Sequence, residues 1–320
     1  MRSTGAPLLL SLAVLTLAAA VPVPVAAASR CDRACLYGVL NAYLGALKAK
    51  DPALAPWATK AVTSENNVVL TAGDGLWGTV TGLGDYDLRF ADTATGQVAY
   101  YGVVQETDTA SPLALRLKVR RGRIVEAETL VARPQEAGVP FVTAAISANP
   151  LLNEIVPPGE RSSRARMIEL ANGYFDTLQM NDGRLHTVFD DQCNRREDGF
   201  QTTNHPDSGY GPTLALGCAD QFRLGWYRYD DRLRARRFEV VDEERGLVMA
   251  AGFIDHAGRL GEYTLTDGRV VQSTIFRRPH SYCLLETFKI RRGKIQQVEA
   301  VFTTVPYRMP SPWAHGPASR

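Results

Sequence analysis

Two pairs of similar segments decide the fold of this chain. NAYLGALKAKDP from Asn41 matches NGYFDTLQMNDG from Asn172, and LKVRRGRIVEAETLV from Leu117 matches FKIRRGKIQQVEAVF from Phe288. The first pair is offset by 131 residues and the second by 171. The two halves of the chain therefore form a repeat, and the second copy is about 40 residues longer than the first.

Each half is expected to begin with one amphipathic helix, because apolar residues recur at helical spacing. In the first half they are Leu36, Val39, Leu40, Tyr43, Leu44 and Leu47, and in the second half Met167, Ala171, Tyr174, Phe175 and Leu178. The Arg-Arg-Gly triplets predict hairpin turns between alternating strands, with Gly122 and Gly293 supplying the positive φ. A helix followed by antiparallel strands indicates an α+β fold in which a curved sheet packs around the helix.

The composition bounds the function classes. The chain has 320 residues, of which 45% are hydrophobic, and 36 basic side chains balance 34 acidic ones. This balance excludes a polybasic nucleic-acid binder and an acidic disordered tail. The length suggests two domains with ample residues for a core.

The N-terminus has the three-part pattern of a secretory signal peptide. Arg2 is the only charge in the first 29 residues, an apolar run follows from Leu8 to Ala20, and Ala26 and Ala28 are suitable for a peptidase. The run is shorter than the roughly 20 residues that span a bilayer. We expect cleavage after Ala28 and a secreted or periplasmic protein that does not contact the membrane after cleavage.

The repeat predicts the domain boundaries. Residues 1–28 are the signal peptide, 29–133 the first domain, 134–160 a proline-rich packed linker, 161–310 the second domain and 311–320 a tail. The extra residues of the second copy are expected around 202–217 and around 257–280.

Five cysteines are expected to form two disulfides in an oxidising compartment. We expect Cys31–Cys35 and Cys193–Cys218, and we interpret Cys283, in an alternating strand, as an inert buried thiol. Because i,i+4 Cβ atoms of a regular helix are about 5–6 Å apart, the first pair requires an irregular first turn. No Cys-x-x-Cys motif or adjacent histidine indicates a metal site.

The segments GDGLWGTVTGLGDY from Gly73, DDQCNRREDGFQTTNHP from Asp190 and RRFEVVDEERGLV from Arg236 carry a family resemblance. They resemble the nuclear-transport-factor-2-like superfamily, which includes SnoaL-like polyketide cyclases, and more closely a group of secreted bacterial and fungal proteins with two such domains. The resemblance implies two tandem cone-shaped domains, each with a helix packed in a strongly curved antiparallel sheet and a pocket at the wide end. It also implies that the domains pair within one chain, as a monomer. No reaction of that group carries over.

The densest cluster of ionisable residues is 190–198 in the second half. The resemblance places this segment at the pocket mouth, where Asp190, Asp191 or Glu197 would be a general base and Arg195 would stabilise an enolate or carboxylate. His205, in an Asn-His-Pro turn, would assist as an acid or base. The alternative for the cluster is a solvated charged loop, and for His205 a solvated turn histidine.

A second set of residues is expected to bind the substrate. His256 lies at the end of a strand and aligns with Glu106 at an offset of 150, although the polarity of a hairpin turn also explains both. The remaining members are aromatic or amide side chains, and the aromatic ones are equally typical of a core. They are Asn194, Tyr174, Trp226 and Tyr227.

We therefore expect a cofactor-free and metal-free enzyme of lyase, isomerase or cyclase type that abstracts a proton from a small organic molecule in the second domain. The chain contains no P-loop, no Gly-x-Ser-x-Gly elbow, no His-Glu-x-x-His and no Rossmann fingerprint. The rival is a non-catalytic module that binds a small molecule or carbohydrate in a shallow aromatic groove around Trp77, Trp226 and Tyr227. In a third interpretation, the first domain is degenerate and structural. No nucleic-acid partner is expected.

Overall fold

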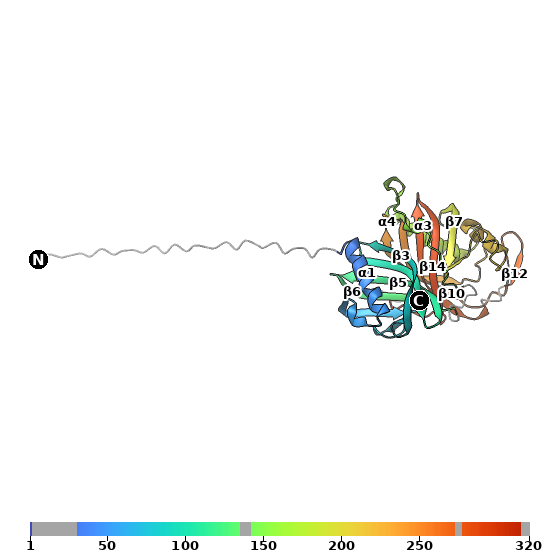
Figure 1. The fold of residues 1–320 in the computed structure, drawn as a ribbon. Coiled ribbons are helices and arrows are strands. Elements are labelled where there is room, and N and C mark those ends of the chain that lie inside the picture. The colour runs from blue at the N-terminus through green and yellow to red at the C-terminus, as the bar shows by residue number, and fades with distance from the viewer. Residues whose placement is uncertain (2–30, 135–141, 273–276, 315–320) are drawn as a thin grey trace.

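The computed structural model describes Met1 and residues 31–134, 142–272 and 277–314. It contains two six-stranded sheets, each with one long helix on its concave face (Figure 1). The expected signal peptide, residues 1–28, lies outside the described residues apart from Met1. Within the described part of the chain, no helix has the length and apolar character needed to cross a membrane.

The first domain has the sheet order β2-β1-β6-β5-β4-β3, with the short α2 between β2 and β3. Its elements are α1 (Arg33–Lys48), η1 (Pro52–Leu54), β1 (Trp57–Glu65), β2 (Val68–Leu70), α2 (Leu76–Thr79), β3 (Val80–Asp92), β4 (Gln97–Glu106), β5 (Thr109–Arg120) and β6 (Arg123–Val131). The connection to the second domain contains α3 (Pro150–Asn153) and η2 (Pro158–Glu160).

The second domain repeats this order as β8-β7-β14-β13-β10-β9. Its main elements are α4 (Arg164–Met180), β7 (Phe189–Glu197), β8 (Phe200–Gln201), β9 (Arg232–Asp242), β10 (Leu247–His256), β13 (His280–Arg291) and β14 (Lys294–Val305). The elements absent from the first domain are η3 (Pro212–Ala215), α5 (Cys218–Arg223), and a separate hairpin of β11 (Glu262–Thr264) and β12 (Val270–Gln272). They include both segments in which the sequence predicts extra residues.

The two tandem cone-shaped α+β domains are confirmed, with one refinement of the strand directions. Neighbouring strands are antiparallel except at one position in each sheet, where β1 pairs parallel with β6 and β7 pairs parallel with β14. The strand that follows the helix therefore lies beside the last strand of its own domain. Both Arg-Arg-Gly turns join antiparallel strands, and positive φ at Arg121, Gly122, Arg292 and Gly293 is typical of tight hairpin turns.

Each long helix begins at a side-chain cap and buries one apolar face. Asp32 accepts a hydrogen bond from the Cys35 amide at the start of α1, and Ser163 caps α4 in the same way. Both predicted disulfides are formed, Cys31–Cys35 and Cys193–Cys218. Because Cys31 precedes the helix cap, the first bridge does not require a distorted turn inside α1.

The two sheets pack against each other through their convex faces. A cluster of buried apolar residues from both sheets fills this interface, including Leu88, Tyr101, Met249 and Leu285. Each concave face has its own core with its own helix. The two domains are therefore related as the halves of a dimer contained in one chain.

Reciprocal ion pairs mark this twofold relation. Arg33 at the start of α1 pairs with Asp242 at the end of β9, and Arg164 at the start of α4 pairs with Asp92 at the end of β3. Each aspartate also accepts a backbone N–H from the opposite domain, Asp242 from Ala91 at 3.2 Å and Asp92 from Val241 at 3.1 Å. Buried carboxylates thus hold the domains in register from both sides.

The chain beyond the second domain returns to the first. Trp313 is buried, its indole N–H donates to Ser64 Oγ at 3.0 Å, and the Arg116 guanidinium lies 5.0 Å from its ring centre. Asn67 also donates to the Pro310 carbonyl at 2.9 Å. The described part of the expected tail is therefore a strap across the first domain.

Candidate functional site

The second domain encloses a cavity of about 190 Å³ between α4, the concave face of the sheet and the segments inserted after β8. Tyr210, Thr213 and Leu214 form one wall, and they belong to the first insertion. The second insertion supports another wall, because the Tyr263 hydroxyl donates to the Trp226 carbonyl. The extra residues of the second copy thus build the cover of this cavity.

One end of the cavity holds a buried aspartate–histidine pair. His256 is 1% exposed, and its Nε2 lies 2.7 Å from Asp230 Oδ1. The imidazole stacks on His280 with 4.6 Å between ring centres and on Tyr229 at 5.7 Å. Burial raises the pKa of Asp230 above its ordinary value, and the His256 ring opposes this rise. The histidine is therefore held in one orientation, as an acid–base group requires.

The other end holds Arg195, which is 2% exposed and reaches the cavity from β7. Its guanidinium donates to Glu197, to the Tyr227 hydroxyl at 2.8 Å and to Gln221 Oε1 at 3.1 Å. Its Cζ lies 5.0 Å from the ring centres of both Phe222 and Tyr227. Charge neutralisation by Glu197 and contact with aromatic rings allow a guanidinium to remain charged in this interior.

Glu286 is a second acid at this end. It is 4% exposed, lies on β13 and lines the cavity in the same cross-strand row as Ala300 and Glu197. Burial raises the pKa of Glu286 to about 8, with Glu197 adding to the rise and Arg195 opposing it. A hydrogen bond with Tyr174 also opposes the rise. The carboxyl group is therefore mostly protonated at neutral pH and is able to donate a hydrogen bond.

The structure brings some of the predicted site residues together and leaves others outside. Those that line the cavity are Tyr174, Arg195, Glu197, Trp226, Tyr227 and His256. Those outside its lining are Asp190, Asp191, Asn194 and His205.

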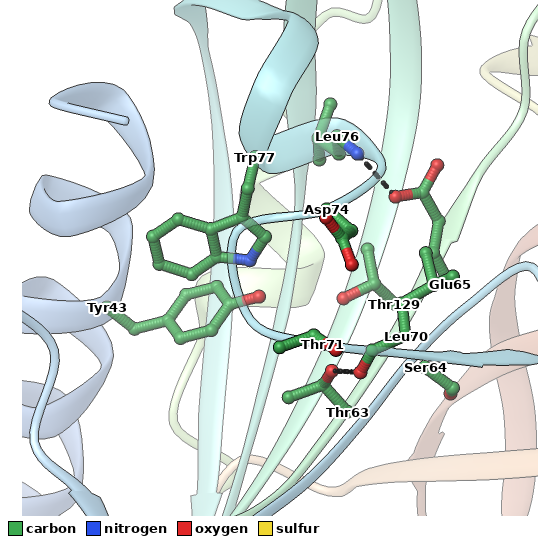
Figure 2. A pocket seen from close by; sticks show the side chains of 10 residues that line it. All are labelled: Tyr43, Thr63, Ser64, Glu65, Leu70, Thr71, Asp74, Leu76, Trp77 and Thr129. Atoms are coloured by element: carbon green, nitrogen blue, oxygen red, sulfur yellow. Dashed lines mark hydrogen bonds between the residues drawn. The ribbon is translucent and has the colours of Figure 1, made fainter. Parts of the chain in front are cut away.

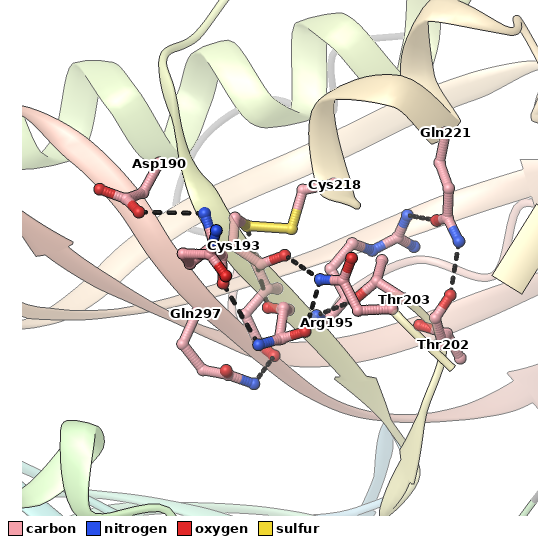
Figure 3. Close-up of a disulfide and its surroundings, with 12 residues drawn as sticks. Asp190, Cys193, Arg195, Thr202, Thr203, Cys218, Gln221 and Gln297 are labelled. Atoms are coloured by element: carbon pink, nitrogen blue, oxygen red, sulfur yellow. Dashed lines mark hydrogen bonds between the residues drawn. A yellow bond between two sulfur atoms is a disulfide. The ribbon is translucent and has the colours of Figure 1, made fainter. Parts of the chain in front are cut away.

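The predicted site residues outside the cavity lie at the surface or contact other groups. Asp190 and Asp191 line a separate surface depression beside α5, and Figure 3 shows Asp190 across the Cys193–Cys218 bridge from Arg195. Asn194 Oδ1 accepts a hydrogen bond from Asn204 at 2.7 Å. His205 packs on the Phe200 ring, with its Nδ1 3.0 Å from the Gln201 carbonyl oxygen. The base therefore has to be sought among the residues that face the cavity.

Two acidic residues of the site were missed from the sequence. Asp230 lies in the irregular segment between α5 and β9, where no periodicity predicts its direction. Glu286 could have been predicted from the sequence, because it is a carboxyl group within the mostly apolar run YCLLETF of β13. An ionisable residue in a fully buried strand requires a partner or a function.

Among the described residues of the first domain, the corresponding place holds only a much smaller space. Trp77 from α2 lies beside Tyr43 of α1 (Figure 2). The two rings pack edge-on with 5.2 Å between their centres, and the Trp57 ring centre lies 6.2 Å from that of Trp77. The space left beside them is about 20 Å³, which is enough for one water molecule. The indole ring thus fills the first cone.

Ion pairs close the mouth of the first cone. Glu65 and Glu106, the last residues of β1 and β4, both pair with Arg133 at 2.8 and 2.7 Å. Glu197 and His256 are the last residues of β7 and β10, so they occupy the equivalent positions. The predicted equivalence of Glu106 and His256 therefore holds in the fold, with a structural ion pair in one domain and a cavity-lining histidine in the other.

Comparison with known proteins identifies a family. The family described as "Domain of unknown function (DUF8021)" matches residues 29–131 and 160–302. No curated protein matches the chain.

Among solved structures, similar chains each correspond to part of this one. A protein of unknown function with a cystatin-like fold from Methylobium petroleophilum is 19% identical, with a TM-score of 0.29 over 35% of this chain and 86% of that chain. An NTF-2 like protein of unknown function from Burkholderia xenovorans is 12% identical, with a TM-score of 0.26 over 31% and 83%. A SnoaL-like polyketide cyclase from Agrobacterium tumefaciens is 18% identical, with a TM-score of 0.26 over 42% and 90%.

Proposed function

The chain belongs to the DUF8021 family, and from the geometry of its second domain we propose that it is an enzyme that moves a proton on a small organic molecule. The observation that carries this proposal is the buried Asp230–His256 pair at one end of a mostly apolar cavity. Enclosed cavities with buried carboxyl groups of shifted pKa are typical of acid–base catalysis.

In this proposal His256 is the general base. The Asp230 carboxylate accepts a hydrogen bond from Nε2–H, which makes Nδ1 the basic nitrogen and holds the ring in place. A substrate C–H proton moves to His256, and the electron pair of the broken bond moves towards the oxygen of an adjacent carbonyl group. Return of the proton to another carbon completes an isomerisation, and loss of a leaving group completes an elimination.

The opposite end of the cavity would stabilise the oxygen that gains charge. Glu286 is protonated at neutral pH, since burial raises its pKa to about 8, so it donates a hydrogen bond there. The sequence-based candidates Asp190, Asp191 and His205 have no part in this mechanism. Glu197 keeps a role as the counter-ion of Arg195.

We also place the protein in an exported compartment. Two disulfides are typical of proteins that fold under oxidising conditions. The signal-peptide pattern of the N-terminus supports the same location.

The test is a screen for binding and turnover with the purified mature protein. A metabolite mixture is added, stabilisation is followed by thermal shift, and products are separated by chromatography before mass spectrometry, so that an isomer of unchanged mass is resolved from its substrate. We expect a product peak that disappears in His256→Gln and Asp230→Asn and persists in the surface control Asp191→Asn. Turnover that persists in His256→Gln would refute the proposed base.

The second candidate function is ligand binding without turnover. The aromatic lining, with Trp226 and Tyr227 among its members, favours it. Stabilisation by a ligand with no new product peak, isomers of unchanged mass included, would support this function over the enzyme.

A further inference from the structure

Two polar atoms at the Arg195 end of the cavity lack a hydrogen-bond partner within the described part of the chain. They are Thr202 Oγ1 and Arg195 Nε, and both residues are at least 97% buried and line the cavity. The two residues are adjacent, because the Thr202 amide donates to the Arg195 carbonyl at 2.9 Å. A buried polar group without a hydrogen-bond partner is destabilising, so a cavity ligand that bonds to both atoms gains affinity.

The hydrogen-bonding properties of these two atoms determine which ligand group would bind them. A guanidinium Nε–H is only a donor, and a threonine hydroxyl donates as readily as it accepts. Glu286, in the neighbouring cross-strand row, adds a third donor while it is protonated. Donors from three strands or strand ends therefore converge on one region, which fits an acceptor oxygen such as that of a ketone or lactone.

The charges at this end disfavour ionic ligands of either sign. Arg195 is already neutralised by Glu197, and its remaining donors contact Tyr227 and Gln221. A carboxylate or phosphate ligand would meet Glu197 without an unpaired cation to compensate. A cationic ligand would meet the Arg195 charge, which already lies against the Phe222 and Tyr227 rings.

The size and lining of the cavity limit the shape of the ligand. A dry cavity of about 150 Å³ holds benzene, and this one measures about 190 Å³. Aromatic side chains such as Tyr174, Trp226, Tyr229 and Tyr282 supply flat apolar walls. One ring or two fused rings satisfy both the volume and the walls.

We propose that the second-domain cavity binds a neutral, flat molecule of one or two rings, with a carbonyl oxygen held by Thr202, Arg195 and Glu286. This inference rests on the proposed function for its site, and it names the class of ligand. It places the oxygen at the end of the cavity away from Asp230 and His256. The ring system then extends from the carbonyl group towards the base.

The experiment compares four probes of the same bicyclic size with the full mature protein. They are 1-tetralone (a neutral ketone), naphthalene, 1-naphthoate and N-methylquinolinium, each titrated against tryptophan fluorescence and by calorimetry at pH 6.5. We expect the ketone to bind at least about fivefold more tightly than naphthalene, since one to two hydrogen bonds are gained. Little or no binding of the two ions is expected.

Two substitutions locate the oxygen. Thr202→Val is expected to weaken ketone binding about three- to tenfold, while the matched Thr71→Val in the filled first domain leaves it unchanged. For the native protein, ketone affinity is expected to fall as the pH rises through about 8, where Glu286 loses its proton. Glu286→Gln keeps a donor at this position and removes this dependence.

The outcomes separate this inference from the proposed function. Tighter binding of naphthoate or of the quinolinium, or equal binding of ketone and naphthalene, overturns the ligand class. Ketone binding that is insensitive to Thr202→Val overturns the placement of the oxygen. Ketone binding with the expected profile but no exchange of its α-protons with solvent deuterium leaves the ligand class standing and contradicts only the catalytic role.

Discussion

Replacing Asp198 by asparagine is expected to stabilise the second domain, and to do so more strongly as the pH rises. Asp198 is fully buried after β7, and its Oδ1 accepts the Phe302 amide at 2.9 Å. Asn66 occupies the equivalent turn of the first domain with the same φ of 46°. Asn66 accepts from the Val131 amide at 2.9 Å and donates to the Val131 carbonyl at 3.2 Å. Asp198 Oδ2 has no hydrogen-bond partner in the described part of the chain, so a protonated carboxyl group or an asparagine amide would supply the donor that Asn66 supplies in the first domain.

The pH dependence follows from the direction of the pKa shift. Burial raises the pKa of Asp198 well above its ordinary value, the Phe302 amide opposes the rise and Glu197 adds to it. The stability that Asp198 contributes is therefore fully present below its unfolded pKa of about 3.9, and is lost as the pH rises towards the folded pKa. The slope is about 1.4 kcal/mol per pH unit, so stability falls by about 2.7 kcal/mol between pH 5 and pH 7 if the proton is kept throughout. Asparagine does not titrate, so Asp198→Asn does not lose this stability as the pH rises.

The assay is urea denaturation of the native protein and Asp198→Asn at pH 4, 5, 6 and 7, followed by tryptophan fluorescence. The free energies of unfolding of the native protein and Asp198→Asn should be nearly equal at pH 4 and should diverge as the pH rises. The contributions of all other titrating groups cancel in the difference between the two. Asn66→Asp is the reciprocal control and should introduce the same pH dependence into the first domain. A constant difference between Asp198→Asn and the native protein at every pH would refute the protonated state.

Three further changes test the architecture. Asp242→Ala leaves the buried Ala91 amide without its acceptor, while Arg33 keeps Glu244, and should cost about 1–3 kcal/mol in urea denaturation. The surface change Asp191→Ala should cost less than about 0.5 kcal/mol. Joint replacement of Cys193 and Cys218 by alanine opens a 25-residue loop and should cost about 3.5 kcal/mol, seen as a lower melting temperature. Reductant should lower the melting temperature of this variant less than that of the native protein, because it then acts only on Cys31–Cys35. Trp313→Ala should destabilise the first domain by about 3–5 kcal/mol while ligand binding in the second domain is retained; loss of binding would show that the strap acts on the cavity.

Most of the fold could be predicted from the sequence because the repeat encodes it locally. The helix periodicity, the two Arg-Arg-Gly turns and the cysteine pairing each depend on residues close in the chain. The parallel pairing of β1 with β6 and of β7 with β14 could not be read in this way, since it joins the two ends of each domain. The return of Trp313 to the first domain is also a long-range contact without local periodicity.

The site was only partly predictable because the alternation of side chains is interrupted in β7, the strand that carries most of the predicted catalytic residues. The pairing of β7 with β14 shifts register between Phe189 and Asn194, so the face of Asp190 and Asp191 cannot be extrapolated from Arg195 and Glu197. Beyond the shift, alternation holds, and Arg195 and Glu197 both line the cavity.

The most direct test of the catalytic role is uptake of solvent deuterium by a bound ligand. The compounds that stabilise the native protein are incubated in D₂O with the native protein, with His256→Gln or with Asp191→Asn. The mass of each compound is then measured by mass spectrometry. The proposed mechanism predicts that at least one compound gains a deuterium with the native protein and with Asp191→Asn, and that His256→Gln abolishes this gain. Stabilising compounds that bind in the cavity of the native protein and gain no deuterium would contradict it.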